Sequence, residues 1–250
     1  SDINGCLDTA SISVQVDQLP NVVASSAFNS ICLGDSVLIS ASGALNYQWG
    51  NGVQISNQYV SPTTIGNNSY IVTGSDVNSC SNSDTVNVLV NSLPIAQVSA
   101  SDTNICINDT ITLLSSAASN YQWNNGSTSQ SQTLILGNAG TTIFTVTIFD
   151  NNSCSATDSV IVNVNNNPTI SVSANNNNIC IGESVTLSAT GAINYLWDNG
   201  VTSNTQVITP STSAILTYSV VGTDINSCSS NAQVNITVNP LPNTGPIFHN

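Results

Sequence analysis

The sequence predicts an all-β chain that is built from tandem antiparallel β-sandwich domains. Two observations carry this prediction. The tryptophans and cysteines recur with one period, and apolar residues alternate with polar ones without any helical apolar stripe. The interval between successive members is identical in each of three series: Trp49, Trp123 and Trp197; Cys32, Cys106 and Cys180; Cys80, Cys154 and Cys228. Three independent series that share one period without an insertion define an internal repeat.

The period divides the chain into three complete repeats and two partial ones. A proline recurs at every boundary, at Pro20, Pro94, Pro168 and Pro242. The predicted domains are the end of a preceding repeat at 1–20, three complete repeats at 21–94, 95–168 and 169–242, and the start of a following repeat at 243–250. Because proline restricts both its own backbone and that of the preceding residue, we expect semi-rigid junctions within a longer array.

Within each repeat, short alternating segments predict half-buried strands. Residues 184–189 and 232–238 alternate between polar and apolar side chains and are rich in β-branched residues. Asn-Gly pairs follow each tryptophan, and they favour the positive φ angles of a tight hairpin. These pairs are Asn51-Gly52, Asn125-Gly126 and Asn199-Gly200. Several short strands within one repeat, separated by such turns, predict a small sandwich.

The composition excludes several classes of partner. The chain has no Lys or Arg, 13 acidic residues and a net charge of −13. Affinity for nucleic acid comes mostly from Lys and Arg, so nucleic acid and anionic membrane surfaces are excluded as partners. No segment reaches the roughly 18 apolar residues of a membrane-spanning helix, so we expect no membrane insertion. Stability must come from burial, backbone hydrogen bonds and disulfides.

The cysteines predict one disulfide within each repeat. Each repeat holds two cysteines with the same spacing, which predicts the pairs Cys32–Cys80, Cys106–Cys154 and Cys180–Cys228. Metal ligation is the competing interpretation, but the chain has no CxxC pair and only one histidine, His249. Cys6 is expected to be unpaired in this sequence because its mate would lie upstream; a link between chains is the alternative. Disulfides indicate an oxidising, extracellular compartment.

A longer motif carries a resemblance to a known group of repeats. It runs through Ile179-Cys180-Ile181-Gly182-Glu183, the segment 194–200 around Trp197, Tyr218-Ser219-Val220 and Asp224-Ile225-Asn226-Ser227-Cys228. This succession resembles the Ig-like and PKD-like repeats of large Bacteroidetes cell-surface proteins, which are gliding-associated, type IX secreted adhesins or filaments. The resemblance implies an Ig-like fold and a location outside the cell. The chain departs from antibody domains because Cys228 follows Tyr218 by ten residues rather than two.

Each tryptophan is the second aromatic residue of a Tyr-x-Trp pair, so both rings point to one face of a strand. A tryptophan on the third strand of a sandwich usually fills the core, and we assign Trp49, Trp123 and Trp197 to the core. The alternative is an exposed aromatic platform that binds sugars.

An acidic turn precedes the second cysteine of every repeat, at Asp76, Asp150 and Asp224. Hard cations favour clustered oxygen ligands, which makes these residues candidates for a Ca²⁺ site. Each turn supplies one carboxylate, however, and Asp also closes turns by accepting hydrogen bonds from its own backbone. We expect no other cofactor.

Five short segments of the type Asp-Ser/Thr-apolar resemble the O-glycosylation acceptor of Bacteroidetes. The hydroxyl residues of these segments are Thr9, Ser36, Thr85, Thr110 and Ser159. Because strand starts favour similar residues, modification and simple strand initiation both remain open at these positions.

The sequence offers no catalytic constellation, because a nucleophile and base pair requires a His or Lys near Ser or Cys. We therefore expect a non-catalytic structural repeat region of an extracellular filament or adhesin stalk. Its expected partners are neighbouring repeats or copies of itself. A carbohydrate- or cell-binding adhesin module, with surface glycans as partners, is the alternative.

Overall fold

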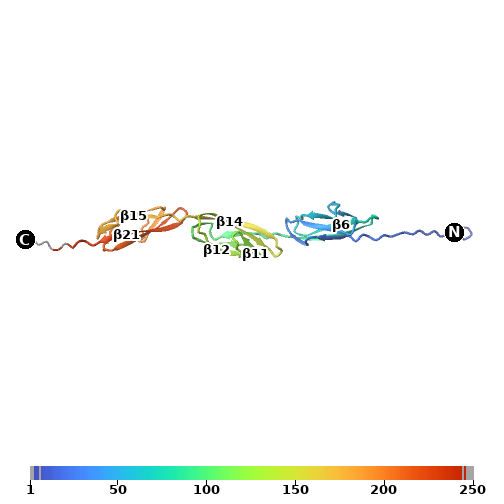
Figure 1. The fold of residues 1–250 in the computed structure, drawn as a ribbon, viewed down its shortest axis with the longest axis horizontal. Helices are drawn as coiled ribbons and strands as arrows, with labels where there is room; N and C mark the ends of the chain where they lie inside the picture. Colours follow the sequence, from blue (N-terminus) through green and yellow to red (C-terminus); the bar gives the residue numbers. More distant parts are fainter. Residues whose placement is uncertain (1–2, 6, 244, 246–250) are drawn as a thin grey trace, which may run out of the picture. The chain divides into compact units, whose positions relative to one another are not determined.

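The computed structural model describes residues 3–5, 7–243 and 245, and within them the regular structure consists of strands alone. In this part of the chain, 21 strands form three successive sets of seven, one set for each repeat, and Figure 1 shows them in sequence order. The predicted all-β fold is therefore confirmed. No helix in the described part is long and apolar enough to cross a membrane.

The strand bounds repeat with the sequence period. The first repeat contains β1 (Val23–Ser26), β2 (Ser30–Cys32), β3 (Val37–Ser42), β4 (Asn46–Trp49), β5 (Asn57–Val60), β6 (Gly66–Ser75) and β7 (Ser81–Asn91). The second contains β8 (Val98–Ala100), β9 (Asn104–Cys106), β10 (Thr110–Ser115), β11 (Asn120–Trp123), β12 (Ser131–Ile135), β13 (Gly140–Phe149) and β14 (Ser155–Asn165). The third contains β15 (Ser171–Ala174), β16 (Asn178–Cys180), β17 (Val185–Thr190), β18 (Asn194–Trp197), β19 (Thr205–Ile208), β20 (Ile215–Thr223) and β21 (Ser229–Asn239).

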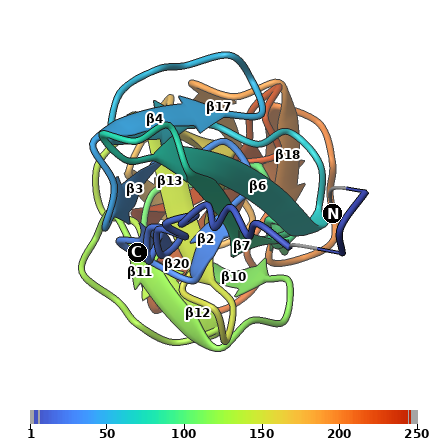
Figure 2. The same ribbon diagram turned by 90° about the vertical axis from the view of Figure 1, so that its right-hand side faces the viewer.

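Each repeat folds into a three-stranded and a four-stranded sheet. In the first repeat the orders are β1-β3-β5 and β2-β7-β6-β4, and β4 and β6 lie side by side in Figure 2. The second repeat has β8-β10-β12 and β9-β14-β13-β11, and the third has β15-β17-β19 and β16-β21-β20-β18. Two facing sheets of this kind form the predicted sandwich.

The core of each repeat lies between its two sheets. In the first repeat, Ile39 from the small sheet and Trp49, Val72 and Val88 from the large sheet belong to one buried cluster. The third repeat builds an equivalent cluster around Leu187 and Trp197. The alternation of buried and exposed residues along the strands follows from the two-residue period of the β conformation.

One strand pair in each repeat is parallel. The short second strand runs beside the end of the last strand, so that Cys32 stands opposite Asn91 in the first repeat. The pairs β9–β14 and β16–β21 have the same register. This pairing fixes where the first cysteine of a repeat lies.

The chain divides into two compact units that do not coincide with the sequence repeats. One unit contains the described residues up to Ile95 together with Ile148–Ala156, and the other contains Ala96–Thr147 with the described residues from Thr157 onward. The short segment Ile148–Ala156 holds Cys154 and belongs to the second repeat in sequence. It nevertheless packs with the first repeat.

Candidate functional site

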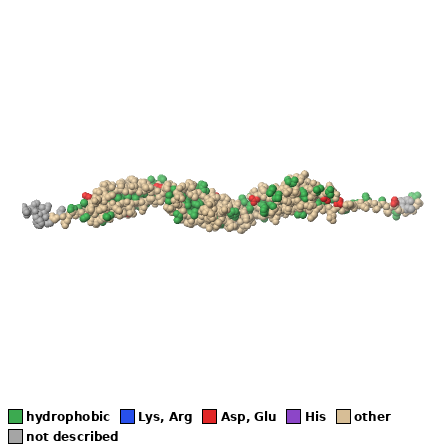
Figure 3. Space-filling view, viewed as in Figure 1, with side chains coloured by type: hydrophobic (Ala, Val, Ile, Leu, Met, Phe, Trp, Pro, Cys, Tyr) green, Lys and Arg blue, Asp and Glu red, His purple; other side chains and the backbone are tan. Residues whose placement is uncertain are grey.

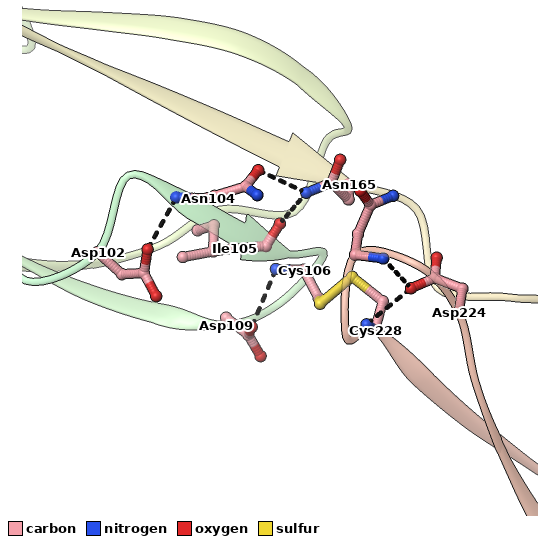
Figure 4. The surroundings of a disulfide bond; sticks show 9 residues. Asp102, Asn104, Ile105, Cys106, Asp109, Asn165, Asp224 and Cys228 are labelled. Atoms are coloured by element: carbon pink, nitrogen blue, oxygen red, sulfur yellow. Dashed lines mark hydrogen bonds between the residues drawn. A yellow bond between two sulfur atoms is a disulfide. The ribbon is translucent and has the colours of Figure 1, made fainter. Parts of the chain in front are cut away.

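Two disulfides connect successive repeats. Cys32 is bonded to Cys154 and Cys106 to Cys228, each with a Cα–Cα distance of 5.5 Å and a sequence separation of 122 residues. Figure 4 shows the second of these bonds. The first cysteine of one repeat is thus joined to the second cysteine of the next. We call this arrangement an inter-repeat joint.

The predicted pairs Cys32–Cys80, Cys106–Cys154 and Cys180–Cys228 are therefore wrong. The two cysteines of one repeat lie at opposite ends of its last strand. Cys80 immediately precedes β7, an 11-residue strand, while Cys32 lies beside Asn91 at the end of that strand. At about 3.3 Å per residue the strand separates them by roughly 35 Å, whereas a disulfide requires Cα atoms within about 7 Å.

The first half of a joint is a tight turn after the parallel strand. The carboxylate of Asp109 accepts the backbone N–H of Cys106 at 3.0 Å, and the N–H of Asp109 donates back to the Cys106 carbonyl at 3.0 Å. Asn108 has a φ of 68°, which such a turn requires at its third position. Ile107 donates its N–H to the carbonyl of Asn165 at the end of β14. We call this four-residue element the strand-end turn.

The second half is the hairpin turn that precedes the last strand. Asp224 accepts the backbone N–H groups of Asn226 and Cys228 with one carboxylate oxygen, both at 2.9 Å. The N–H of Asp224 donates to the Cys228 carbonyl, and Ser227 adopts a φ of 66°. The carboxylate therefore holds the cysteine at a fixed position on the turn. We call this five-residue element, from Asp to Cys, the hairpin turn.

Closing a joint buries the cysteine of the hairpin turn. Cys154 is 1% exposed and Cys228 0% exposed, while Cys80, in the same kind of turn, is only partly buried. In the first unit, Asn152 and Ser153 line one shallow pocket together with Phe28 and residues around Cys32. The hairpin turn therefore packs against the strand-end turn as well as bonding to it.

Two described cysteines, Cys80 and Cys180, have free thiols. Each belongs to a complete turn of the kind used in the joints. The predicted unpaired cysteine, Cys6, lies outside the described residues.

The three tryptophans lie in the cores. Trp49, Trp123 and Trp197 are 1–2% exposed, and each indole N–H donates to a backbone carbonyl: Ile55 at 3.0 Å, Ser129 at 2.8 Å and Ser203 at 2.9 Å. The tyrosines of the Tyr-x-Trp pairs bond to the backbone as well, as Tyr47 does with Ala44. The tryptophan rings cannot serve as a sugar-binding platform because they are buried.

Each of the three calcium candidates binds backbone N–H groups of its own turn and is not grouped with other carboxylates. Asp76, Asp150 and Asp224 each accept two N–H groups within their own hairpin turn. Within the described residues no three His, Cys, Asp or Glu side chains are grouped as metal ligands. The recurrence of Asp in this turn is therefore explained by its hydrogen bonds to the turn backbone.

The carboxylate of Asp84, the acidic residue of the Asp-Thr segment that contains Thr85, connects the two sheets of the first repeat. Asp84 on β7 accepts the N–H of Ala24 on β1 at 2.7 Å and that of Thr85 at 2.8 Å. These two hydrogen bonds lower the pKa of Asp84. Asp158 bonds to Val98 in the same way at 2.8 Å, but the third repeat has Ala232 at this position.

The candidate glycosylation residues all lie at the surface. Thr9, Ser36, Thr85, Thr110 and Ser159 are exposed. Figure 3 shows a face on which hydrophobic side chains and a few acidic ones are scattered among backbone and other side chains. Glycosylation of the five hydroxyl residues stays a prediction.

The fold and the joints together define the class of this chain. It is an array of immunoglobulin-like β-sandwich repeats in which disulfides join one repeat to the next. No protein-family model matches the sequence, and no curated protein matches it.

Several solved structures are similar to this chain at low sequence identity. A three-domain immunoglobulin segment of titin is 13% identical, with 89% of this chain and 100% of that chain covered and a TM-score of 0.39. A Ca²⁺-stabilised adhesin with which an Antarctic bacterium binds ice is 12% identical, with 92% and 76% covered and a TM-score of 0.38. Fibronectin(III)-like modules of Clostridium thermocellum CbhA are 14% identical, with 58% and 95% covered and a TM-score of 0.31. None of these likenesses assigns a ligand or partner to this chain.

Proposed function

We propose that this chain is a load-bearing structural region of an extracellular filament or adhesin stalk, without catalytic activity. The observation that supports the proposal is the pairing of both disulfides between successive repeats rather than within them. A bond within a repeat protects only that repeat. A bond between repeats transmits force from one sandwich to the next without stretching the backbone between them.

The covalent route between the ends is short when both joints are closed. It follows the backbone to Cys32, crosses to Cys154, returns to Cys106, crosses to Cys228 and continues to the end of the chain. This route contains about 105 residues, against about 250 in the reduced chain, so the fully extended lengths are about 360 Å and about 850 Å. Unfolding of the sandwiches therefore lengthens the oxidised chain far less than the reduced one.

The proposed location rests on the same bonds. Structural disulfides persist in oxidising compartments and are rare in the cytosol. A surface rich in Asn, Ser and Thr and free of Lys and Arg offers no attraction to nucleic acid or anionic lipid. The carbohydrate-binding alternative lacks the aromatic platform on which it depended, because the three tryptophans lie in the core.

Single-molecule stretching of the full chain between handles at its two ends tests the proposal. In oxidising buffer the extension after complete unfolding is expected to stop about 500 Å short of the extension reached with a reducing agent, because the joints exclude roughly 145 residues from the stretched path. The reduced chain is the matched control. Equal final extensions in the two buffers would contradict a load-bearing role for the joints.

A further inference from the structure

We propose that one glutamine in each repeat protects an Asn-Gly pair from deamidation. The pair lies in the loop between the tryptophan strand and the next strand, which we call the tryptophan loop. Asn-Gly is especially prone to deamidation because glycine has no side chain to hinder attack by its backbone nitrogen. The inference goes beyond the proposed function and does not depend on the joints. The three pairs are Asn51-Gly52, Asn125-Gly126 and Asn199-Gly200.

Deamidation of such a pair is an attack by the main chain on its own side chain. The backbone nitrogen of the glycine bonds to the Cγ carbon of the asparagine. The side-chain amide leaves as ammonia and takes up the proton of the glycine N–H. Water then opens the cyclic imide to aspartate, or to isoaspartate, in which the main chain runs through the side chain. The reaction therefore requires a free glycine nitrogen and an asparagine side chain that can rotate toward it.

The fold of the tryptophan loop occupies the attacking nitrogen. In the first repeat, Gly52 donates its N–H to the carbonyl of Trp49 at 2.8 Å. The N–H of Trp49 donates in turn to the carbonyl of Val53 at 2.8 Å, which closes the loop. The corresponding glycines of the second and third repeats make the same bond to their tryptophans at 3.0 Å and 2.9 Å. Each glycine must therefore give up a hydrogen bond before it can attack.

The asparagine side chain is held at both atoms of its amide. In the first repeat, Oδ1 of Asn51 accepts the backbone N–H of Val53 at 3.3 Å, and Nδ2 donates to Oε1 of Gln58 at 2.8 Å. Because a backbone N–H can only donate, the amide oxygen must face it and the amide nitrogen must face the glutamine. We call this Asn–Gln pair the amide clamp. Rotation of Asn51 toward Gly52 would break both hydrogen bonds.

The amide clamp recurs in every repeat with a separation of seven residues. Asn125 donates to Gln132 at 2.8 Å, and Asn199 donates to Gln206 at 2.6 Å. Each asparagine also accepts the backbone N–H two residues ahead, at 3.2 Å and 3.3 Å. The glutamines lie on β5, β12 and β19, edge strands of the small sheets, whereas the asparagines follow β4, β11 and β18, edge strands of the large sheets. The clamp thus anchors the loop to the opposite sheet.

The hydrogen bonding of the glutamine itself does not explain its presence. Gln206 is 8% exposed, and the Nε2 atoms of Gln132 and Gln206 are buried without a hydrogen-bond partner. A buried donor without an acceptor lowers stability. What the side chain supplies at this position is the Oε1 acceptor for the asparagine.

Deamidation in the tryptophan loop would reach the core. The loop of the first repeat carries the Ile55 carbonyl, which accepts the indole N–H of Trp49 at 3.0 Å. Isoaspartate would add one main-chain atom between these two residues. Aspartate would add a negative charge to a chain that already has a net charge of −13 and no Lys or Arg. Either product would alter a loop that positions a core side chain.

The test uses three single variants of the full chain, Gln58→Met, Gln132→Met and Gln206→Met. Methionine keeps a long unbranched side chain but is only a weak acceptor. After incubation in mildly alkaline buffer and digestion with pepsin, mass spectrometry measures aspartate and isoaspartate at each of the three asparagines. Each variant is expected to speed deamidation about 2–10-fold at its own asparagine, which corresponds to one lost hydrogen bond. The other two asparagines of the same chain should keep the wild-type rate.

The unfolding midpoint separates protection from a merely structural role. Gln132→Met and Gln206→Met also remove a buried donor that has no partner, so their midpoints are expected not to fall. Faster deamidation at an unchanged or higher midpoint supports the proposal. Faster deamidation of all three asparagines in one variant would instead indicate general unfolding and overturn it.

Gln54→Met, at an exposed position in the first tryptophan loop, is the matched control. It should leave all three rates unchanged. The chain unfolded in denaturant gives the rate without any clamp, and the folded wild type is expected to be slower at every asparagine. Wild-type rates that equal those of the three glutamine variants would overturn the proposal.

Discussion

Gly191 shows how a single missing side chain shapes a repeat. It has a φ of +101°, and a Cβ built there would lie 2.0 Å from the carbonyl oxygen of Thr169. Gly200 also has a positive φ, of +84°, but its surroundings are empty within 4 Å. The first glycine therefore meets both a backbone and a steric requirement, and the second only a backbone one.

We expect Gly191→Ala to destabilise the chain considerably more than Gly200→Ala. The strain of a positive φ costs about 1 kcal/mol in both variants, and the clash with a backbone atom adds about 1–3 kcal/mol at Gly191 alone. Chemical denaturation of the two variants measures the difference. Similar losses in both would show that the close approach to Thr169 carries no energetic weight.

The lowered pKa of Asp84 predicts that the stability of the fold depends on pH in the acidic range. Hydrogen bonds from Ala24 and Thr85 lower its pKa in the folded state, so the ionised form stabilises the fold above the unfolded pKa. That contribution is lost as the pH falls below about 4 and through the lower pKa of the folded state. We expect Asp84→Asn to lower the unfolding midpoint at pH 7, with a smaller difference from the wild type below pH 3.

The matched control for this prediction is Asp8→Asn, at an exposed position before the first strand. It should leave the midpoint unchanged at both pH values. If the unfolding midpoints of Asp84→Asn and the wild type differed by the same amount at every acidic pH, the pH dependence could not be attributed to ionised Asp84.

At the scale of elements, the hairpin turn is the part that positions a joint. Removing the carboxylate in Asp224→Ala leaves the N–H groups of Asn226 and Cys228 without their acceptor. We expect a loss of about 1–3 kcal/mol in the free energy of unfolding and faster reduction of Cys106–Cys228 by dithiothreitol. Asp76→Ala removes the same acceptor from a turn that closes no joint within the chain, so it should leave that reduction rate unchanged.

The hairpin turns also allow a direct test of calcium binding. Because each Asp is already used by two backbone amides, we expect the unfolding midpoint to be the same with and without a chelator. A lower midpoint in the chelator, recovered by adding Ca²⁺, would restore the cation interpretation of Asp76, Asp150 and Asp224.

The sequence predicts most elements because their causes are local. Alternation predicts the strands, and Asn199-Gly200 marks the turn after the tryptophan strand. The pairing of the cysteines could not be predicted in the same way. Because every repeat has the same two cysteines at the same spacing, the sequence fits a bond within one repeat as well as a bond to the next repeat. The deciding feature is the parallel pairing of β2 with β7, a non-local contact that places Cys32 at the far end of the strand that begins after Cys80.

For the whole molecule, the pairing predicts how a stretched chain lengthens as its bonds are reduced. When either disulfide breaks first, the shortest route grows from about 105 to about 130 residues, and when the second breaks it reaches about 250. We therefore expect two unequal steps, of about 85 Å and then about 410 Å, in force spectroscopy with dithiothreitol. Three equal steps would instead indicate disulfides confined to single repeats.

The overlap of the two disulfide loops gives the array tolerance to proteolytic damage. The loop from Cys32 to Cys154 and the loop from Cys106 to Cys228 together enclose every peptide bond between Cys32 and Cys228. A single cleavage anywhere in that interval leaves the two fragments covalently attached. An array built in this way survives a nick in an exposed loop as one molecule, and it separates only when a second cut or a reductant removes the remaining connection.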